Sequence, residues 1–158
     1  MDVRIRPAAA ADYDAVNRVF TSELAHHVSL LPDRFQMIDP VMSRRWYDDV
    51  LAQPNKLLQL AQVDGSVAGL ALLVDMVSLD DPIHRPRRYL EVDELAVLPE
   101  YRRLGIGRRL MEEAERIAAA RGIPTVELHV WEVNDQARAF YDRLGYRTIR
   151  RRLARDLA

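Results

Sequence analysis

Hydrophobic and polar positions along the chain predict helices and strands in a mixed order. Apolar side chains recur every three or four positions after Asp12 and from Gly105 to Arg121, a spacing typical of helices with one buried face. Two apolar runs flank Asp64-Gly65, a dipeptide that favours a tight hairpin turn. The predicted elements, in order, are a strand at 3–6, a helix after Asp12, a helix from Asp39-Pro40 to Gln53, strands at 57–63, 67–76 and 88–98, a helix at 105–121, a strand at 125–130, a helix at 134–144, and one or two last strands between 146 and 157.

This order predicts a single α/β domain over residues 1–158. Hairpin strands followed by alternating strands and helices indicate a mixed sheet with helices on both faces. We expect six to seven strands and about four helices. With 158 residues, of which 49% are hydrophobic and 30% charged, the chain has the length and balance of one globular domain rather than of a disordered segment.

Composition narrows the possible function classes. The 23 basic residues nearly balance the 24 acidic ones, so net charge gives no reason to expect a nucleic acid or a membrane as partner. The absence of cysteine excludes disulfides, thiol nucleophiles and cysteine-ligated metals, and we expect no metal site. The first seven residues lack the apolar core of a signal peptide, and the apolar stretch from Ala68 to Val74 is too short to span a bilayer. We therefore expect a cytoplasmic protein.

A strand leads through a glycine-containing turn into an amphipathic helix between Leu95 and Leu110. Such a turn presents unpaired backbone N–H groups at the positive end of the helix dipole, which suits a pyrophosphate. Gly105 and Gly107 allow a close approach that a Cβ would block, and arginines at 102, 103, 108 and 109 add positive charge. The segment is neither a P-loop nor a dinucleotide fingerprint, since Arg108-Arg109 and Leu110 replace the residues those motifs require. The alternative is a turn that needs glycines for its shape alone.

Two long motifs together resemble the GNAT superfamily, the GCN5-related N-acetyltransferases. The first, LAVLPEYRRLGIG from Leu95 to Gly107, is similar to the family's strand followed by Arg/Gln-x-x-Gly-x-Gly/Ala. The second, NDQARAFYDRLGY from Asn134 to Tyr146, is similar to the family's N-x-x-A-x-x-F-Y-x-x-x-G-F/Y. The opening Ile5-Arg6-Pro7 is also similar to the family, so the resemblance spans almost the whole chain.

The resemblance implies acetyl-coenzyme A (acetyl-CoA) as donor and a primary amine as acceptor. It also implies that the sheet splays in a V between its fourth and fifth strands, with the pantetheine arm of the donor beside the backbone of the fourth strand and the pyrophosphate on the glycine loop. Asn134 is expected to cap its helix and to touch the pantetheine arm. The residues expected to bind the donor are Leu95, Ala96, Val97, Arg102, Arg103, Leu104, Gly105, Ile106, Gly107, Arg108, Asn134 and Tyr141.

Amide formation needs a neutral amine, and an alkylamine with a pKa of about 10.4 is almost fully protonated at pH 7. A carboxylate or an imidazole, acting directly or through water, has to remove that proton. By resemblance, Glu91 matches the base of histone-type members and His129 stands at the position of the base in ribosomal-protein-type members. Glu94 ranks third, and ordered water is a further alternative. Strand alternation is expected to place Glu91, Asp93 and Leu95 on one face of the strand, and Val92 and Glu94 on the other.

Tyr141 matches the tyrosine that protonates the leaving thiolate in the family, and its alternative role is that of a core aromatic beside Phe140. The backbone N–H of Val97 is expected, by the same resemblance, to polarise the thioester carbonyl.

The sequence therefore predicts an acetyl-CoA-dependent N-acetyltransferase that works by direct attack in a ternary complex, since a chain without cysteine has no thiol acyl-enzyme route. A small-molecule amine is favoured as acceptor, because no extended basic or peptide-binding segment is visible. The alternatives are a protein or peptide N-acetyltransferase and a non-catalytic module that senses coenzyme A. Asp80-Asp81, in the polar loop at 77–87, is a candidate for attracting a cationic amine. Dimers are common among such relatives, so a homodimer stays open.

Overall fold

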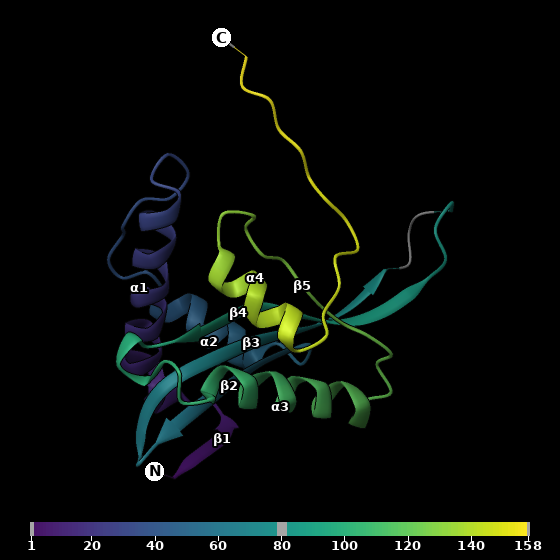
Figure 1. Ribbon diagram of the computed structural model, residues 1–158. Coiled ribbons are helices and arrows are strands. Elements are labelled where there is room, and N and C mark those ends of the chain that lie inside the picture. The colour runs from purple at the N-terminus through teal and green to yellow at the C-terminus, as the bar shows by residue number, and fades with distance from the viewer. Residues whose placement is uncertain (1, 79–81, 158) are drawn as a thin grey trace.

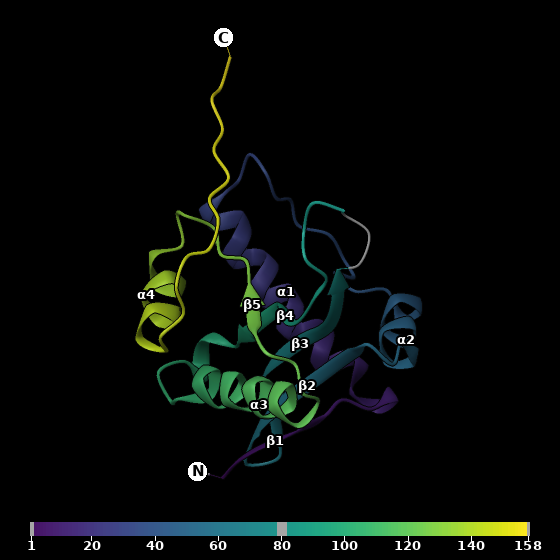
Figure 2. The same ribbon diagram turned by 90° about the vertical axis from the view of Figure 1, so that its right-hand side faces the viewer.

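The computed structural model describes residues 2–78 and 82–157, and within them one five-stranded sheet lies between two pairs of helices (Figure 1 and Figure 2). Strands β1 (Val3–Pro7), β2 (Lys56–Val63), β3 (Ser66–Ser78) and β4 (Arg87–Val97) are antiparallel neighbours, and β5 (Val126–Leu128) pairs with β4 in parallel. Helices α1 (Tyr13–Leu30) and α2 (Arg44–Ala52) cover one face, and α3 (Ile106–Ala120) and α4 (Asp135–Arg143) pack on the other. Short 3₁₀ turns η1 (Ala10–Asp12) and η2 (Pro99–Tyr101) precede α1 and follow β4.

Two buried apolar clusters, one on each face of the sheet, hold the helices in place. Side chains of β3 alternate between the two clusters. Leu70 and Leu72 pack toward α1 and α2, while Ala71 and Leu73 pack toward α3. The predicted stripe of α3, which includes Leu110, is buried in the second cluster. Each large apolar side chain buried in this way stabilises the fold by roughly 1.5–3 kcal/mol relative to an exposed one.

The sequence pattern predicted the hairpin turn correctly but placed the start of α2 too early. The hairpin at Asp64-Gly65 is confirmed, with positive φ angles of 47° and 87° at its two central residues. Helix α2 begins at Arg44 rather than at Asp39-Pro40, because the Ser43 hydroxyl accepts the Trp46 N–H at 3.2 Å and caps the helix there.

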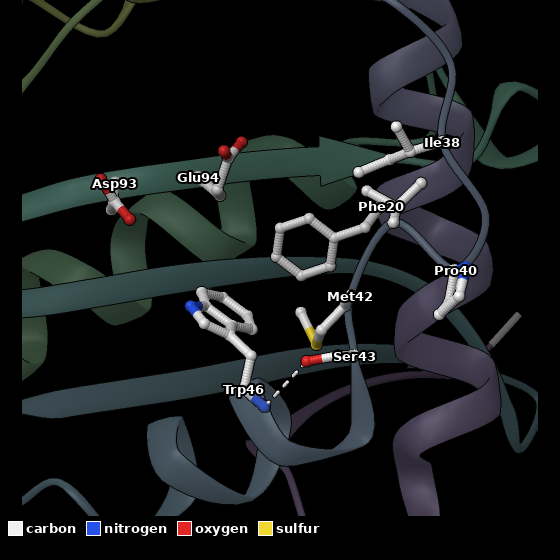
Figure 3. Close-up of a pocket in the computed structure, with 9 residues that line it drawn as sticks. Phe20, Ile38, Pro40, Met42, Ser43, Trp46, Asp93 and Glu94 are labelled. Carbon is white, nitrogen blue, oxygen red and sulfur yellow. Dashed lines mark hydrogen bonds between the residues drawn. The ribbon is translucent and has the colours of Figure 1, made fainter.

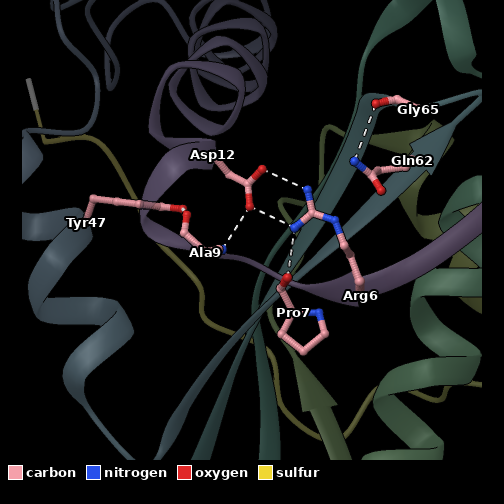
Figure 4. A network of polar contacts seen from close by, with 7 residues as sticks. All are labelled: Arg6, Pro7, Ala9, Asp12, Tyr47, Gln62 and Gly65. Atoms are coloured by element: carbon pink, nitrogen blue, oxygen red, sulfur yellow. Dashed lines mark hydrogen bonds and ion pairs between the residues drawn. The ribbon is translucent and has the colours of Figure 1, made fainter.

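A polar network joins β1 to the helices that cover the sheet (Figure 4). The Asp12 side chain, which directly precedes α1, accepts two hydrogen bonds of 2.7 Å from the Arg6 guanidinium and one of 2.8 Å from the Ala9 N–H. The Arg6 guanidinium therefore holds the pKa of Asp12 below its usual value. The Tyr47 hydroxyl of α2 donates to the Ala9 carbonyl at 2.6 Å. These contacts fix the start of α1 and so help set the direction in which it crosses the sheet.

The expectation of six to seven strands is wrong, because the sheet has five in the part of the chain that the structure describes. Strand β5 is also shorter than the predicted 125–130. Residues 147–157 form no strand and make no hydrogen bond within the described part of the chain, and they run away from the body of the protein (Figure 1 and Figure 2). An alternating sequence forms a strand only when another strand satisfies its backbone groups, and no strand among residues 2–78 and 82–157 lies beside this segment.

The candidate pair Asp80-Asp81 lies outside the described residues. No helix in the described ranges is long and apolar enough to cross a membrane.

Candidate active site

The outer edge of β4 is paired along only part of its length. Strand β5 pairs with Leu90 to Val92, and β4 then continues to Val97 with no described strand on that side. The N–H of Leu98 donates to the Ala68 carbonyl of β3 at 2.9 Å, so backbone alternation turns the N–H groups of Leu95 and Val97 toward the open side. The sheet therefore splays between its fourth and fifth strands, as the resemblance implied, and offers a free backbone edge to an extended ligand.

A bulge at Asp93 reverses the side-chain alternation of β4. The register with β3 shifts there, so that Val92 and Glu94 have partners in β3 and Asp93 has none. Before the bulge Val92 packs toward α3, whereas after it Ala96 packs toward α1 and α2. Asp93 and Glu94 consequently line the same pocket, and Leu95 packs with the α3 cluster. The expectation that Asp93 shares a face with Leu95 and lies opposite Glu94 is wrong, because strict alternation took no account of the extra residue.

A pocket of about 480 Å³ lies beside these two carboxylates (Figure 3). Phe20 of α1 and Trp46 of α2 meet edge to face with ring centroids 6.1 Å apart, and both point toward the strand that carries Asp93 and Glu94. Apart from the two carboxylates and one hydroxyl, the side chains around the pocket are apolar. Its lining consists of Phe20, Ile38, Pro40, Val41, Met42, Ser43, Trp46, Asp93 and Glu94.

Glu94 is the carboxyl of this pocket whose ionisation is most affected by its surroundings. Burial, together with the negative charges of Glu23 and Asp93, raises its pKa to about 7. Near neutral pH the group is therefore divided between its protonated and ionised forms, as a general base requires.

Glu23 belongs to this site, and the sequence analysis did not single it out. Burial raises its pKa, and the nearby charges of His26 and Arg102 act in the opposite direction. The sequence pattern could have pointed to Glu23, because this residue lies at helical spacing from Val16 and Phe20, on the buried face of α1. An acid on an otherwise apolar face is a candidate functional residue.

Tyr141 reaches the same region from the other face of the sheet. Its helix α4 begins where the Asn134 side chain accepts the Ala137 N–H at 3.0 Å, as predicted. Burial raises the pKa of Tyr141, and the charges of Glu23 and Glu94 raise it further. Tyr141 packs with the α3 cluster, whereas Glu94 faces α1 and α2, so the splay brings groups from both faces within electrostatic range of each other.

The loop after β4 keeps its shape through its glycines and one arginine. Gly105 has a φ of 77°, a conformation that side chains with a Cβ rarely adopt, and it precedes α3 with no side-chain cap from the described residues. A Cβ on Gly107 would lie 3.3 Å from the Phe140 ring. The Arg102 Nε–H donates to the Val97 carbonyl at 3.1 Å and ties the loop to the open edge of β4. Exposed N–H groups at a helix start, with no side chain over them, fit a pyrophosphate.

The family model described as the acetyltransferase (GNAT) family matches residues 24–146. The chain belongs to the GNAT acetyltransferase family. Members of this family use acyl-CoA donors, which agrees with the splayed edge and the glycine loop described above.

Solved structures confirm the GNAT fold at low sequence identity. A mutant of the BH1408 protein from Bacillus halodurans is 24% identical, with a TM-score of 0.94 over 98% of this chain and 99% of that one. The aminoglycoside N-acetyltransferase AAC(6')-Iy in complex with CoA is 14% identical, with a TM-score of 0.70 over 99% of each chain. A ribosomal-protein-alanine N-acetyltransferase from Brucella melitensis is 18% identical, with a TM-score of 0.70 over 99% of this chain and 100% of that one.

The two residues that the sequence ranked first as the general base, one carboxylate and one imidazole, are paired with each other. Glu91 on β4 and His129, just after β5, approach to 3.0 Å, and the His129 side chain is 84% exposed. Neither residue lines the apolar pocket. Their role as base stays a prediction. Within residues 2–78 and 82–157, no group of three or more His, Asp or Glu side chains is arranged to hold a metal ion.

Proposed function

We propose that this GNAT acetyltransferase transfers the acetyl group of acetyl-CoA to the primary amine of a small molecule with an apolar body. The observation that carries the proposal is the position of Glu94. This carboxyl, with its pKa raised to about 7, lines an apolar pocket and also interacts with Tyr141 across the splay of the sheet. The proposed base and the proposed acid therefore lie within electrostatic range of each other, where an acceptor pocket adjoins a free strand edge.

The donor side of the cleft is formed by the edge of β4 and the glycine loop. Acetyl-CoA supplies an acetyl group activated as a thioester. The outward N–H groups of Leu95 and Val97 fit the amide groups of the pantetheine arm, and the N–H groups that follow Gly105 fit the pyrophosphate. Gly107 leaves room beside Phe140 that any side chain would fill. The N–H of Val97 is also the group proposed to polarise the thioester carbonyl.

The acceptor side of the cleft favours a cation joined to an apolar group. Asp93 and Glu94 attract an ammonium group, and the Trp46 ring provides a face for a cation or an aromatic ring. Phe20 and Met42 offer apolar contact to the rest of the molecule. A volume of about 480 Å³ is in the range of small-molecule sites. Arylalkylamines and branched alkylamines satisfy these conditions better than highly charged polyamines.

The proton movements follow from the two pKa shifts. Glu94 in its ionised form takes a proton from the ammonium group and releases a neutral amine, whose nitrogen forms the new bond to the acetyl carbon. Tyr141, kept protonated by burial and by the two nearby carboxylates, gives its proton to the departing sulfur. The second proton lost by the amide nitrogen restores the phenol, and Glu94 returns its proton to solvent. The net reaction consumes one ammonium ion and one thioester and yields an amide, a thiol and one proton.

The proposal is tested by measuring thiol release from acetyl-CoA with a panel of arylalkylamines, alkylamines, polyamines and peptides, and by identifying the acetylated product by mass spectrometry. We expect turnover with amines that carry an apolar body. Trp46→Ala should raise KM for such an amine at least tenfold and leave KM for acetyl-CoA unchanged. Arg45→Ala, at the exposed neighbouring position, is the matched control and should change neither constant.

The other outcomes of this assay contradict the proposal. Turnover of peptides without turnover of small amines would point to a protein or peptide N-acetyltransferase. Saturable binding of acetyl-CoA without turnover of any acceptor would point to a coenzyme A sensor.

A further inference from the structure

An aromatic contact joins two connections that lie on opposite sides of the splay. Phe35 belongs to the connection between α1 and α2, and Trp131 belongs to the connection between β5 and α4. Their rings meet edge to face, with centroids 5.7 Å apart and planes 88° apart. The His27 ring, near the end of α1, stacks on Phe35 with centroids 5.0 Å apart, and the Arg34 guanidinium lies 5.6 Å from the centroid of the Trp131 ring. The side chains of His27, Phe35 and Trp131 are called the clasp below.

Both ends of the clasp are anchored near the groups of the candidate active site. His27 Nε2 lies 3.6 Å from a carboxylate oxygen of Glu23, one turn earlier on α1. On the other side, the Asn134 N–H donates to the Trp131 carbonyl at 2.9 Å and ties it to the start of α4, the helix that carries Tyr141. Both views place the end of α1 beside the connection between β5 and α4 (Figure 1 and Figure 2). The clasp therefore spans the splay next to the proposed reacting groups.

The chain that carries Phe35 goes on to form a wall of the acceptor pocket. Ile38, Pro40 and Val41 follow it closely in sequence and line this pocket (Figure 3). A clasp that holds Phe35 against Trp131 therefore also holds this wall in position. Edge-to-face rings at the observed separation are in van der Waals contact, so no chain that extends from an acceptor passes between them.

We propose that the clasp sets the length of the acceptor, because it closes the splay beside the pocket. An amine with a compact apolar body fits inside the pocket of about 480 Å³. An amine at the end of a peptide needs a way out for the rest of its chain, which grows by about 3.3 Å with each extended residue. The clasp lies across that way out. Phe35 and Trp131 are thus specificity-determining residues for the proposed acetyl transfer, on which this inference rests.

The test compares two acceptors that share an aromatic amine and differ in length, namely phenethylamine and phenylalanyl-diglycine amide. The quantity measured is kcat/KM for the peptide divided by kcat/KM for the short amine, from thiol release. Phe35→Ala and Trp131→Ala should each raise this ratio about tenfold or more. Met37→Ala is the matched control, since it shortens an exposed side chain of the same connection that is not part of the clasp, and it should leave the ratio unchanged. Phe35 and Trp131 lie outside the two buried clusters, so their variants should fold.

The outcomes separate this inference from the proposed transfer itself. Turnover of the short amine with the same ratio in all three variants overturns the length limit and leaves the acetyl transfer standing. A natural protein that acetylates the peptide as efficiently as the short amine overturns the length limit as well.

Binding of the same two ligands to the CoA-loaded protein, measured by calorimetry, covers the case in which neither is acetylated. Dissociation constants that shift in favour of the peptide in Phe35→Ala and Trp131→Ala, but not in Met37→Ala, would support the length limit although the proposed transfer had failed. Binding of neither ligand, or an equal shift in all three variants, contradicts the inference.

Discussion

Replacing Glu94 by glutamine removes a buried charge while nearly conserving the shape of the pocket. Burial and the charges of Glu23 and Asp93 raise the pKa of Glu94 from its ordinary value of 4.5 to about 7. The folded protein therefore holds this proton more tightly than the unfolded chain does, and its stability falls as pH rises from about 4.5 to about 7. A shift of this size corresponds to about 3 kcal/mol.

Glu94→Gln should consequently be more stable than the natural protein above pH 7 and of equal stability near pH 4. For a domain of this size, where 1 kcal/mol corresponds to about 2–4 °C, the expected rise in Tm at pH 8 is roughly 6–12 °C. Thermal unfolding of both proteins at pH 4, 6 and 8 measures the effect. A constant difference in Tm at all three pH values would refute the reasoning, because the gain would then not come from a titrating carboxyl.

The same substitution should cost activity. In the natural protein kcat should rise with the ionised fraction of Glu94 and level off above pH 7. In Glu94→Gln, kcat at pH 7 should fall about 10²–10⁴-fold and should keep rising toward the pKa of the free amine. Glu91→Gln is the matched control and should leave the midpoint of the profile in place. If instead Glu91→Gln moves the midpoint and Glu94→Gln does not, the base is Glu91 and the assignment to Glu94 is wrong.

Two further substitutions test the other parts of the cleft. Tyr141→Phe keeps the ring packing and removes the proposed acid, so kcat should fall about 10²-fold or more with KM for acetyl-CoA unchanged, and an unaltered kcat would assign the tyrosine to the core alone. Gly107→Val places a side chain where a Cβ already lies 3.3 Å from Phe140, so calorimetry should show at least tenfold weaker binding of CoA, whereas Ala119→Val on the exposed far end of the same helix should bind CoA normally.

The order of elements along most of the chain followed from hydrophobic period and turn residues. The hairpin at Asp64-Gly65 and the Asn134 cap of α4 are local features, since each depends on residues that are close in sequence. The long motifs predict the donor loop for the same reason, and its contact with the donor stays a proposal. The start of α2 was misplaced because the Ser43 hydroxyl competes as a cap with Asp39-Pro40, and propensity alone did not decide between them.

The features that could not be predicted from the sequence depend on contacts between distant segments of the chain. The bulge at Asp93 becomes visible only in the pairing of β4 with β3, and it turns Glu94 into the pocket. The raised pKa of Glu94 depends on burial and on Glu23, which arrives on α1 from far away in the chain. The last strands failed to form for a similar reason, because alternation indicates a capacity to pair but does not supply the neighbouring strand.

The central claim is that acetyl-CoA lies along the splayed edge of β4 with its pyrophosphate on the start of α3. Hydrogen–deuterium exchange of the backbone, measured with and without saturating CoA, tests it at the level of single segments. Peptides that cover residues 95–97 and 102–108 should become protected, while the distant strand β1 should exchange unchanged. Protection confined to other segments, or none at a CoA concentration that saturates binding, would contradict the account.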